Sequence, residues 1–385
     1  MNNSSNHVYY DLNIVNNNQD AKTEPPRLVF NDIRNSNILS NPSDYYLSVV
    51  RFTLQTANSI PIWIPEIDVT DNLMADKTIY SFTLKYNGFS SDQRYVYYEA
   101  ENNLAPPVMP IRPGDSYNLP YYYVSNFDHV VEMLNGALSA SFADLYVKVL
   151  NAGGNMPSNN PPFIEWNFET GKMIFNADVL GYYYNVDQSA LGHIEIYCNT
   201  SMKVLLSGFR SRLVTVDSPD GSNYKLIIKK DINELNLYKL PTYTAIQLYQ
   251  QYGTGALFNP VSSIVFTSAL IPVVSTNTSK PTIYNGNNNL MNSGNNSNIS
   301  SMLTDFEVQD SNGYGYCSQI EYVPSGEYRL IDLQGGGNEN ALQNIEISVF
   351  WKDAYSNLHP LYIQPGCRCD LKIMFRKKSY QSTLM

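Results

Sequence analysis

The stretch YYLSVVRFTLQT, at residues 45–56, decides the fold class. It is rich in aromatic and β-branched residues, which are enriched in strands. Successive side chains of a strand point to opposite faces. Leu47 and Val49 would therefore lie on one face and Phe52 and Leu54 on the other, so neither face is purely polar. The stretch predicts a strand with both faces covered.

Other strand candidates have the same character, and Asn87-Gly88 after one of them is a hairpin turn signal. Because strands do not alternate with helices, a doubly wound α/β sheet is excluded. Short strands with Pro- and Gly-rich turns predict an all-β, antiparallel fold, either a sandwich or a jelly roll. The clearest candidates are residues 45–56, 78–86, 94–100, 261–274, 303–308, 327–333, 345–351 and 370–376.

One amphipathic helix is predicted, with Ser125 as its N-cap and Asp128 as the capping-box partner. Apolar residues recur at helical spacing from Phe127 to Leu145. This pattern is typical of a helix that packs on a core. The apolar positions are Phe127, Val130, Val131, Leu134, Leu138, Phe142 and Leu145.

Composition excludes several classes of protein. The 385 residues carry a net charge of −10, which argues against a protein that coats nucleic acid or binds an anionic membrane. No run approaches ~18 apolar residues, so no membrane span is expected. The first residues, MNNSSNHVYYDLN, do not read as a secretory signal.

No motif for chemistry stands out, so we expect no enzyme, catalytic residue, cofactor or metal. There are four histidines and no recognisable nucleophile or phosphate-loop motif. Four cysteines are too few for a disulfide scaffold. Cys367 and Cys369 would share one face of a strand, where they could bind a metal or form a strained bridge, although two reduced small residues are the simpler interpretation.

The clear cationic cluster is Arg376, Lys377 and Lys378 near the C-terminus. A solvated terminal run is the plain interpretation. The alternative is a weak, salt-sensitive contact with nucleic acid.

Several blocks of the last third resemble the C-terminal strands of capsid proteins from polinton-like viruses and virophages. The segment 45–65 and the helix at 127–145 fit the same family. The blocks that carry the resemblance are SIVFTS at 263–268 with LIPVV at 270–274, EYRLIDL at 327–333, IEISVFWKD at 345–353, NLHPL at 357–361 and LKIMFRKK at 371–378.

The resemblance implies a jelly-roll capsid protein in the virion of an icosahedral double-stranded DNA virus, assembled inside the host cell. About eight good strands favour one jelly roll, and so the minor, penton protein that forms pentamers at the vertices. The alternatives are a double-jelly-roll major capsid protein that forms trimers, and a glycan-binding β protein. Expected partners are further copies, the neighbouring major capsid protein, a host receptor and, at most weakly, packaged DNA.

The strand distribution also predicts a division of the chain. Residues 1–26 read as a polar N-terminal arm, residues 27–100 and 261–385 as a jelly roll built from both chain ends, and residues 101–260 as an inserted outward β-rich domain. The 31 tyrosines and the low content of charged residues, 16%, suit surfaces buried between subunits.

Overall fold

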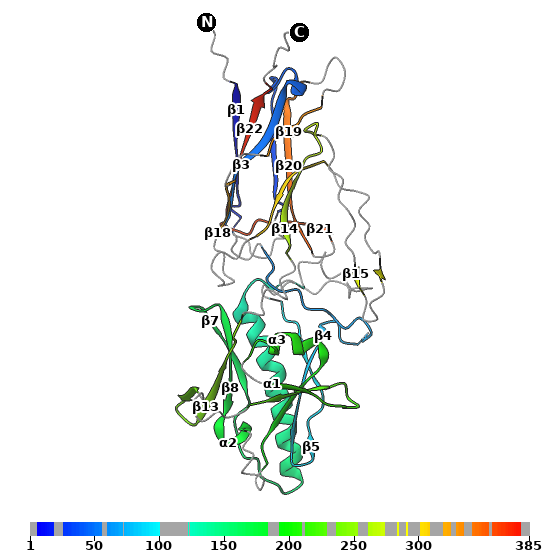
Figure 1. Ribbon diagram of the computed structural model, residues 1–385, viewed down its shortest axis with the longest axis vertical. Helices are drawn as coiled ribbons and strands as arrows, with labels where there is room; N and C mark the ends of the chain where they lie inside the picture. The colour runs from blue at the N-terminus through cyan, green and yellow to red at the C-terminus, as the bar shows by residue number, and fades with distance from the viewer. Residues whose placement is uncertain are drawn as a thin grey trace, which may run out of the picture. The chain divides into compact units, whose positions relative to one another are not determined.

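The chain forms two compact units (Figure 1). The jelly-roll unit comes from residues 1–60, 260–309 and 317–385, and the insertion unit is built around residues 61–259. The computed structural model describes residues 6–18, 26–55, 60–71, 73–100, 122, 124–183, 192–209, 212–228, 236–252, 261–273, 283–284, 290–291, 301–308, 319–324, 329–334, 341–353 and 356–378.

The jelly-roll unit holds two antiparallel sheets of five strands each. The first has the order β1 (His7–Val15), β22 (Arg368–Lys377), β3 (Tyr45–Gln55), β18 (Gln319–Tyr322), with β19 (Ile331–Asp332) also paired to β3. The second has the order β17 (Met302–Phe306), β14 (Ser263–Thr267), β20 (Asn344–Lys352), β2 (Val29–Ile33), with β21 (Leu358–Pro360) paired to β20.

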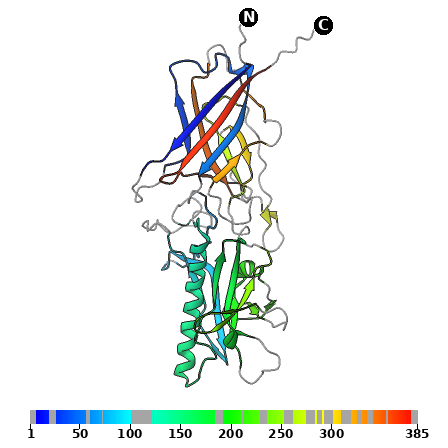
Figure 2. The same cartoon turned by 90° about the vertical axis from the view of Figure 1, so that its left-hand side faces the viewer.

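This strand order is that of a jelly roll. The first and last strands, β1 and β22, are neighbours, and β22 also pairs with β3 (Figure 2). The second strand, β2, pairs with the late strand β20 in the other sheet. Such interleaving of early and late strands is produced by Greek-key connections. The prediction that residues 45–56, 345–351 and 370–376 share one roll is confirmed, and β3 meets β22 across 313 residues of sequence.

A β-bulge explains the mixed faces of the stretch at 45–56. Val49 lies opposite Ile373 and Arg51 opposite Lys372, so Val50 is an extra residue without a partner on β22. Because one residue is inserted, the side chains that point inward change here from odd-numbered to even-numbered residues. Leu47 and Val49 before the bulge, and Phe52 and Leu54 after it, are all buried.

The two sheets pack face to face through apolar side chains. Phe52 of β3 and Phe266 of β14 meet edge to face, with ring centroids 4.9 Å apart. Both rings are fully buried. Phe306 of β17 extends the same aromatic cluster from the second sheet, 5.9 Å from Phe52.

The N-terminal segment differs from the expected arm. Residues His7–Val15 form β1, which pairs along its whole length with β22. The cause is that every second residue of β1 points to the inner side of the sheet and lies opposite an inward-facing residue of β22. The pairs are Val8–Phe375, Tyr10–Ile373, Leu12–Leu371 and Ile14–Cys369. This apolar row, together with the ladder to β22, holds the segment in the roll.

The insertion unit contains two further antiparallel sheets. Its helices are α1 (Phe127–Asn151), α2 (Val179–Tyr182) and α3 (Thr200–Leu206). One sheet has the order β10 (Arg212–Thr215), β11 (Tyr224–Ile227), β9 (Glu195–Cys198), β4 (Lys77–Tyr86), β5 (Phe89–Ser90), with β6 (Arg94–Tyr97) also on β4. The other has the order β12 (Asn236–Lys239), β13 (Thr244–Tyr249), β8 (Lys172–Asp178), β7 (Phe163–Asn167).

The boundary between the units lies near residue 60, not at 100. Strand β4 pairs with β9, which is deep in the inserted segment. Tyr80, Phe82 and Leu84 of β4 belong to the core under α1. The predicted hairpin at Asn87-Gly88 is present, with both residues at positive φ, 47° and 82°. Residues 61–100 therefore complete the insertion unit.

Helix α1 packs against β4, β6 and β7 as predicted, with its apolar face buried. Its N-cap is Asn126 instead of Ser125, because the Asn126 side chain accepts the N–H of Asp128 at 2.8 Å.

We expect Leu134→Ala to lower the free energy of unfolding by about 2 to 5 kcal/mol, since Leu134 is only 1% exposed. Chemical denaturation followed by circular dichroism at the helical signal measures the loss. The matched control is Ser139→Ala, on the exposed side of the same helix, which should stay within about 0.5 kcal/mol of wild type. Equal losses in both variants would contradict the assignment of faces.

Candidate functional surfaces

The predicted cations Arg376, Lys377 and Lys378 lie together at the end of β22. Arg376 stands opposite His7 of β1 and Tyr46 of β3. Backbone hydrogen bonds hold the end of the strand in place: the N–H of Lys377 donates to the carbonyl of Asn6 at 2.8 Å, and that of Lys378 to Asp44 at 2.7 Å. The start of β1 and the end of β22 thus lie side by side.

The three cations are not equivalent. The ammonium of Lys378 contacts Asp332 at 2.9 Å and lies 4.9 Å from the centre of the Tyr46 ring. Arg376 and Lys377 are exposed, and neither forms an ion pair within the described ranges. Two charges are therefore free to meet an anion, which suits only a weak contact.

Along the rest of its outer face, β22 carries both cationic and anionic side chains. Arg368 pairs with Asp370 at 3.1 Å, and Lys372 with Asp11 of β1 at 3.4 Å. Arg51 of β3 lies beside Lys372 in register. Exposed pairs of this kind are worth about 0 to 1 kcal/mol each. Cations are thus offset along the strand, and they dominate only at its end.

Charge is divided unevenly between the two units. The jelly-roll segments carry 12 lysines and arginines against 14 aspartates and glutamates. Residues 61–259 carry 13 against 20. Most of the net negative charge therefore belongs to the insertion unit, and the jelly roll is close to neutral.

A buried acid–base pair lies in the turn between β20 and β21. Asp353 accepts a hydrogen bond from Asn357 N–H at 2.8 Å and contacts Nε2 of His359 at 2.9 Å. The His359 ring stacks on Trp351, with centroids 4.1 Å apart. Burial alone would raise the pKa of Asp353, but the hydrogen bonds from His359 and Asn357 outweigh it and lower that pKa.

The sequence reasoning placed His359 in a plain turn and missed this pair. The available signal was an acid six residues before a histidine, with Asn357 between them. Both side chains are only 3% exposed, so a substrate cannot reach them. Because the pair closes a turn in which Ser356 has φ +66°, its role is to hold the turn.

Two of the described cysteines, Cys198 and Cys369, are buried and have raised thiol pKa values. Cys369 is buried on the inner side of β22, and burial raises the pKa of its thiol well above the usual range. Burial also raises the pKa of Cys198 to about 12. A thiol is a nucleophile or metal ligand only as the thiolate. The described residues hold no group of three or more His, Cys, Asp or Glu that could bind a metal.

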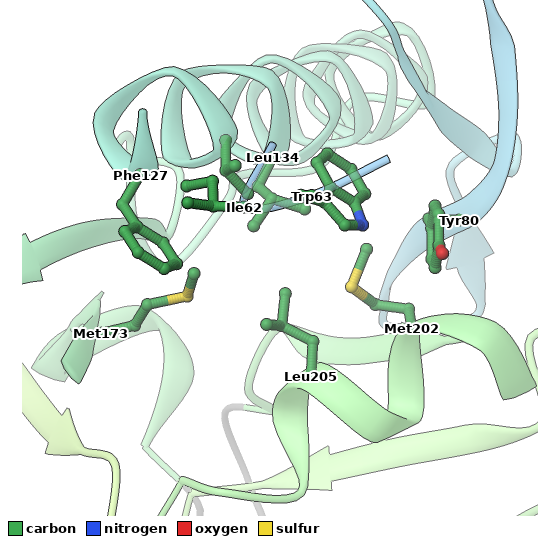
Figure 3. Close-up of a pocket in the computed structure, with 9 residues that line it drawn as sticks. Ile62, Trp63, Tyr80, Phe127, Leu134, Met173, Met202 and Leu205 are labelled. Carbon is green, nitrogen blue, oxygen red and sulfur yellow. The ribbon is translucent and has the colours of Figure 1, made fainter. Parts of the chain in front are cut away.

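A small cavity lies in the core of the insertion unit (Figure 3). Its volume is ≈ 20 Å³, enough for one water molecule but not for an organic ligand. The lining is apolar apart from the tips of Trp63 and Tyr80, so this is a packing gap under α1. The lining residues are Ile62, Trp63, Tyr80, Phe127, Val130, Leu134, Met173, Met202 and Leu205.

The strand order defines the class: a protein built on a single jelly roll, a fold found in viral capsid proteins and in lectins. The family model of the Sputnik minor capsid protein V18/19 matches residues 8–377, and the chain belongs to this family. It is therefore a minor capsid protein, a structural component of the virion that assembles with other capsid proteins.

Individual relatives agree. The chain is 34% identical to "Uncharacterized protein V18" of Sputnik virophage over 146 residues, 37% of this chain and 86% of that protein. It is 27% identical to "Structural protein V19" of Sputnik virophage over 229 residues, 58% of this chain and 96% of that protein.

Two solved structures share the fold. A chain of the Sputnik virophage, from a cryo-EM structure at 3.5 Å, superposes with a TM-score of 0.72 at 27% identity, covering 97% of this chain and 98% of that one. The mavirus penton protein superposes with a TM-score of 0.58 at 18% identity, covering 97% and 99%. No helix among the described residues is long and apolar enough to cross a membrane.

Proposed function

We propose that this protein is the penton subunit, five copies of which form the capsomer at each five-fold vertex. The observation that carries the proposal is the single jelly roll closed by both chain ends around one large insertion. A double-jelly-roll protein would need a second set of eight interleaved strands. The sheets of the insertion unit instead have the different orders given above and pack around α1.

The division of charge supports an orientation. A nearly neutral jelly roll can sit in the shell close to packaged DNA, whereas the acidic insertion unit would be repelled by phosphates. We therefore place the insertion unit on the outer side, where it is also the part that would meet a host receptor. The jelly roll would contact the neighbouring major capsid protein.

The oligomeric state tests the proposal directly. Native mass spectrometry of the purified 43.6 kDa chain should show a species of five copies, and negative-stain images should show five-fold rings. Particles of three copies would support the major capsid alternative instead.

We further propose that the protein acts without catalysis. Its Asp–His pair is sealed from solvent at Asp353 and His359, and the Cys369 thiol stays protonated. Hydrolysis of a glycan or peptide by the purified protein, lost in His359→Gln, would contradict this.

The cations at the end of β22 form a weak contact with packaged DNA in this arrangement. We expect the variant R376A/K377A to reduce the slope of log affinity against log salt by at most about 2, since each phosphate contact contributes about 0.9. Fluorescence anisotropy with a double-stranded oligonucleotide between 50 and 200 mM salt, a range over which about 10³-fold losses occur for strong binders, measures this slope. The control R368A removes a cation that Asp370 already pairs, and should change the slope less.

A further inference from the structure

One sheet of the insertion unit carries side chains that are hydrogen-bonded in a row across three strands. The sheet is β12–β13–β8–β7, and β7, β8 and β13 lie side by side in Figure 1. Phe175 and Leu248 belong to the core. Because side chains alternate along a strand, their neighbours Asn176 and Gln247 point to the opposite face. We call the row on that face the polar row, and its members are Tyr249 and Gln247 of β13, Asn176 of β8 and Glu165 of β7.

Hydrogen bonds hold the polar row from end to end. The hydroxyl of Tyr249 donates to Oε1 of Gln247 at 2.9 Å. Nε2 of Gln247 donates to Oδ1 of Asn176 at 3.0 Å, and Nδ2 of Asn176 donates to Oε2 of Glu165 at 2.9 Å. Asn176 is only 1% exposed, so the middle of the row is fixed. Groups that are already ordered bind a ligand at a lower entropic cost.

Polar atoms at the surface of the row remain available to a ligand. Glu165 is exposed, and Oε1 of its carboxylate forms no hydrogen bond or ion pair with a described residue. Lys172, on the same face, donates instead to the backbone carbonyl of Gln251 at 3.0 Å. Gln247 keeps a second amide N–H, because it donates only one. The polar row therefore presents an acceptor at Glu165 and a donor at Gln247, on either side of Asn176.

Two exposed tyrosine rings flank these groups. Tyr249 is 40% exposed and Tyr238 of β12 is 52% exposed. Tyr238 lies opposite Ala245, which is four residues before Tyr249 on β13. At 3.3 Å per residue the two tyrosines are therefore about 13 Å apart along the strand, on the same face of the sheet. The polar groups of the row lie between them.

We propose that this face binds a neutral oligosaccharide of the host cell surface, an inference that rests on the proposed outward placement of the insertion unit. A sugar ring has an apolar C–H face, which stacks on an aromatic ring, and a rim of hydroxyls that both donate and accept hydrogen bonds. The ring of Tyr249 suits the C–H face. Gln247 and Glu165 supply a donor and an acceptor for the hydroxyls. Tyr238 would hold a further sugar unit of the same chain.

Charge selects the class of ligand. The insertion unit carries 13 cationic against 20 acidic residues, and the polar row adds a carboxylate without an ion pair at Glu165. A nucleic acid, or a glycan that carries sialic acid or sulfate, would be repelled by this field. A neutral sugar is not repelled, and its hydroxyls can donate to the free carboxylate oxygen.

A single site with so few contacts binds weakly, and the proposed capsomer compensates for this. Five copies present five such faces, so several glycan chains can be bound at once. Multivalent binding of this kind raises the overall affinity by about 10² to 10⁴ without any new contact. A weak neutral-sugar site is therefore consistent with attachment by a vertex protein.

The test is the binding of the full chain to a printed array of neutral hexose and N-acetylhexosamine oligosaccharides, with sialylated and sulfated ones beside them. We expect binding to neutral members only. The strongest of these is then titrated by isothermal calorimetry. Y249A and E165Q should each weaken binding about ten-fold or more, since one removes the stacking ring and the other the charged acceptor.

Y238A is a second variant, at a ring that belongs to no hydrogen bond of the polar row, and it should weaken binding in the same direction. All three variants should melt within ~4 °C of wild type, because the changed side chains are exposed. The matched control is Y97A/E321Q, which makes the same two changes at Tyr97 of β6, 43% exposed, and at the exposed Glu321 of β18. It should bind like wild type.

The outcomes separate this inference from the penton function. If wild type forms five-copy particles but binds no neutral oligosaccharide, or if Y249A and E165Q bind as well as the control, the inference is overturned and the penton function stands. Binding to acidic glycans alone, or to a host protein stripped of its sugars, also overturns it. If the particles contain three copies, the penton function fails, and loss of binding in Y249A and E165Q would still support the sugar site.

Discussion

Asp353→Ala should lower the stability of the jelly-roll unit by about 3 to 5 kcal/mol, because it removes the carboxylate that holds buried His359 and the turn at Asn357, and each lost hydrogen-bond partner costs about 1 to 3 kcal/mol. His359 would be left at 3% exposure without the carboxylate that it now contacts at 2.9 Å. The backbone of Asn357 would also lose its acceptor in the turn. The loss should far exceed that of any exposed ion pair in the protein.

The two units can unfold separately, so a local readout is needed. Hydrogen–deuterium exchange should accelerate in peptides from β20 and β22 and stay unchanged in peptides from α1. The control Asp332→Ala removes an exposed carboxylate that pairs with Lys378, and should cost no more than about 1 kcal/mol. Equal exchange in the two variants would show that the buried pair contributes little.

The contribution of Asp353 should also depend on pH. Its pKa is lowered in the folded state, so the folded protein binds fewer protons than the unfolded chain. The stabilisation that the Asp353 carboxylate gives to the folded state is therefore fully present above the unfolded carboxyl pKa of about 3.9. It is lost as the pH falls through the lower pKa that Asp353 has in the folded protein. The difference in stability between wild type and Asp353→Asn should shrink between about pH 4 and pH 2.

Several of the long strands could be predicted from local patterns, but their assembly could not. Alternation and turn residues indicate β4 and the hairpin at Asn87-Gly88 well. Nothing local to residues 78–86 shows that they pair with β9 of the insertion. The unit boundary was therefore placed about 40 residues too late. Likewise β1 is hard to recognise from the sequence, since its apolar row alternates with Tyr9, Asp11 and Asn13 and gains its partner only beside β22.

The candidate functional surfaces, too, could be predicted only in part from the sequence. The run at 376–378 is visible in the sequence as three adjacent cations. That Lys378 is paired with Asp332 depends on β19 lying next to β3, which is a tertiary fact. The Asp353–His359 pair forms only when the turn after β20 closes, which no local pattern in the sequence indicates.

The bulge at Val50 leads to the prediction with the largest effect. Deleting Thr53 from β3 would make Phe52 and Leu54 adjacent, and one of these two fully buried side chains would then point outward. If Phe52 stays inward, Leu54 points outward and Gln55 points inward. Losing a buried Leu or Phe costs about 2 to 5 kcal/mol and burying an unpaired amide about 1 to 3, so the sheet should lose about 3 to 8 kcal/mol.

Deleting Val50 is the matched control, because it shortens the same strand by one residue at the bulge. Val49 and Arg51 already face consecutive residues, Ile373 and Lys372, so removal of the residue between them leaves a regular ladder and restores strict alternation. We expect a loss of about 1 kcal/mol, typical of a half-buried position. Urea unfolding read through exchange in β22 peptides separates the two deletions. Equal losses would mean that the jelly roll needs the bulge for the extra twist that it gives to β3. The switch of the inward-pointing side chains at residue 50 would then be only a consequence of that twist.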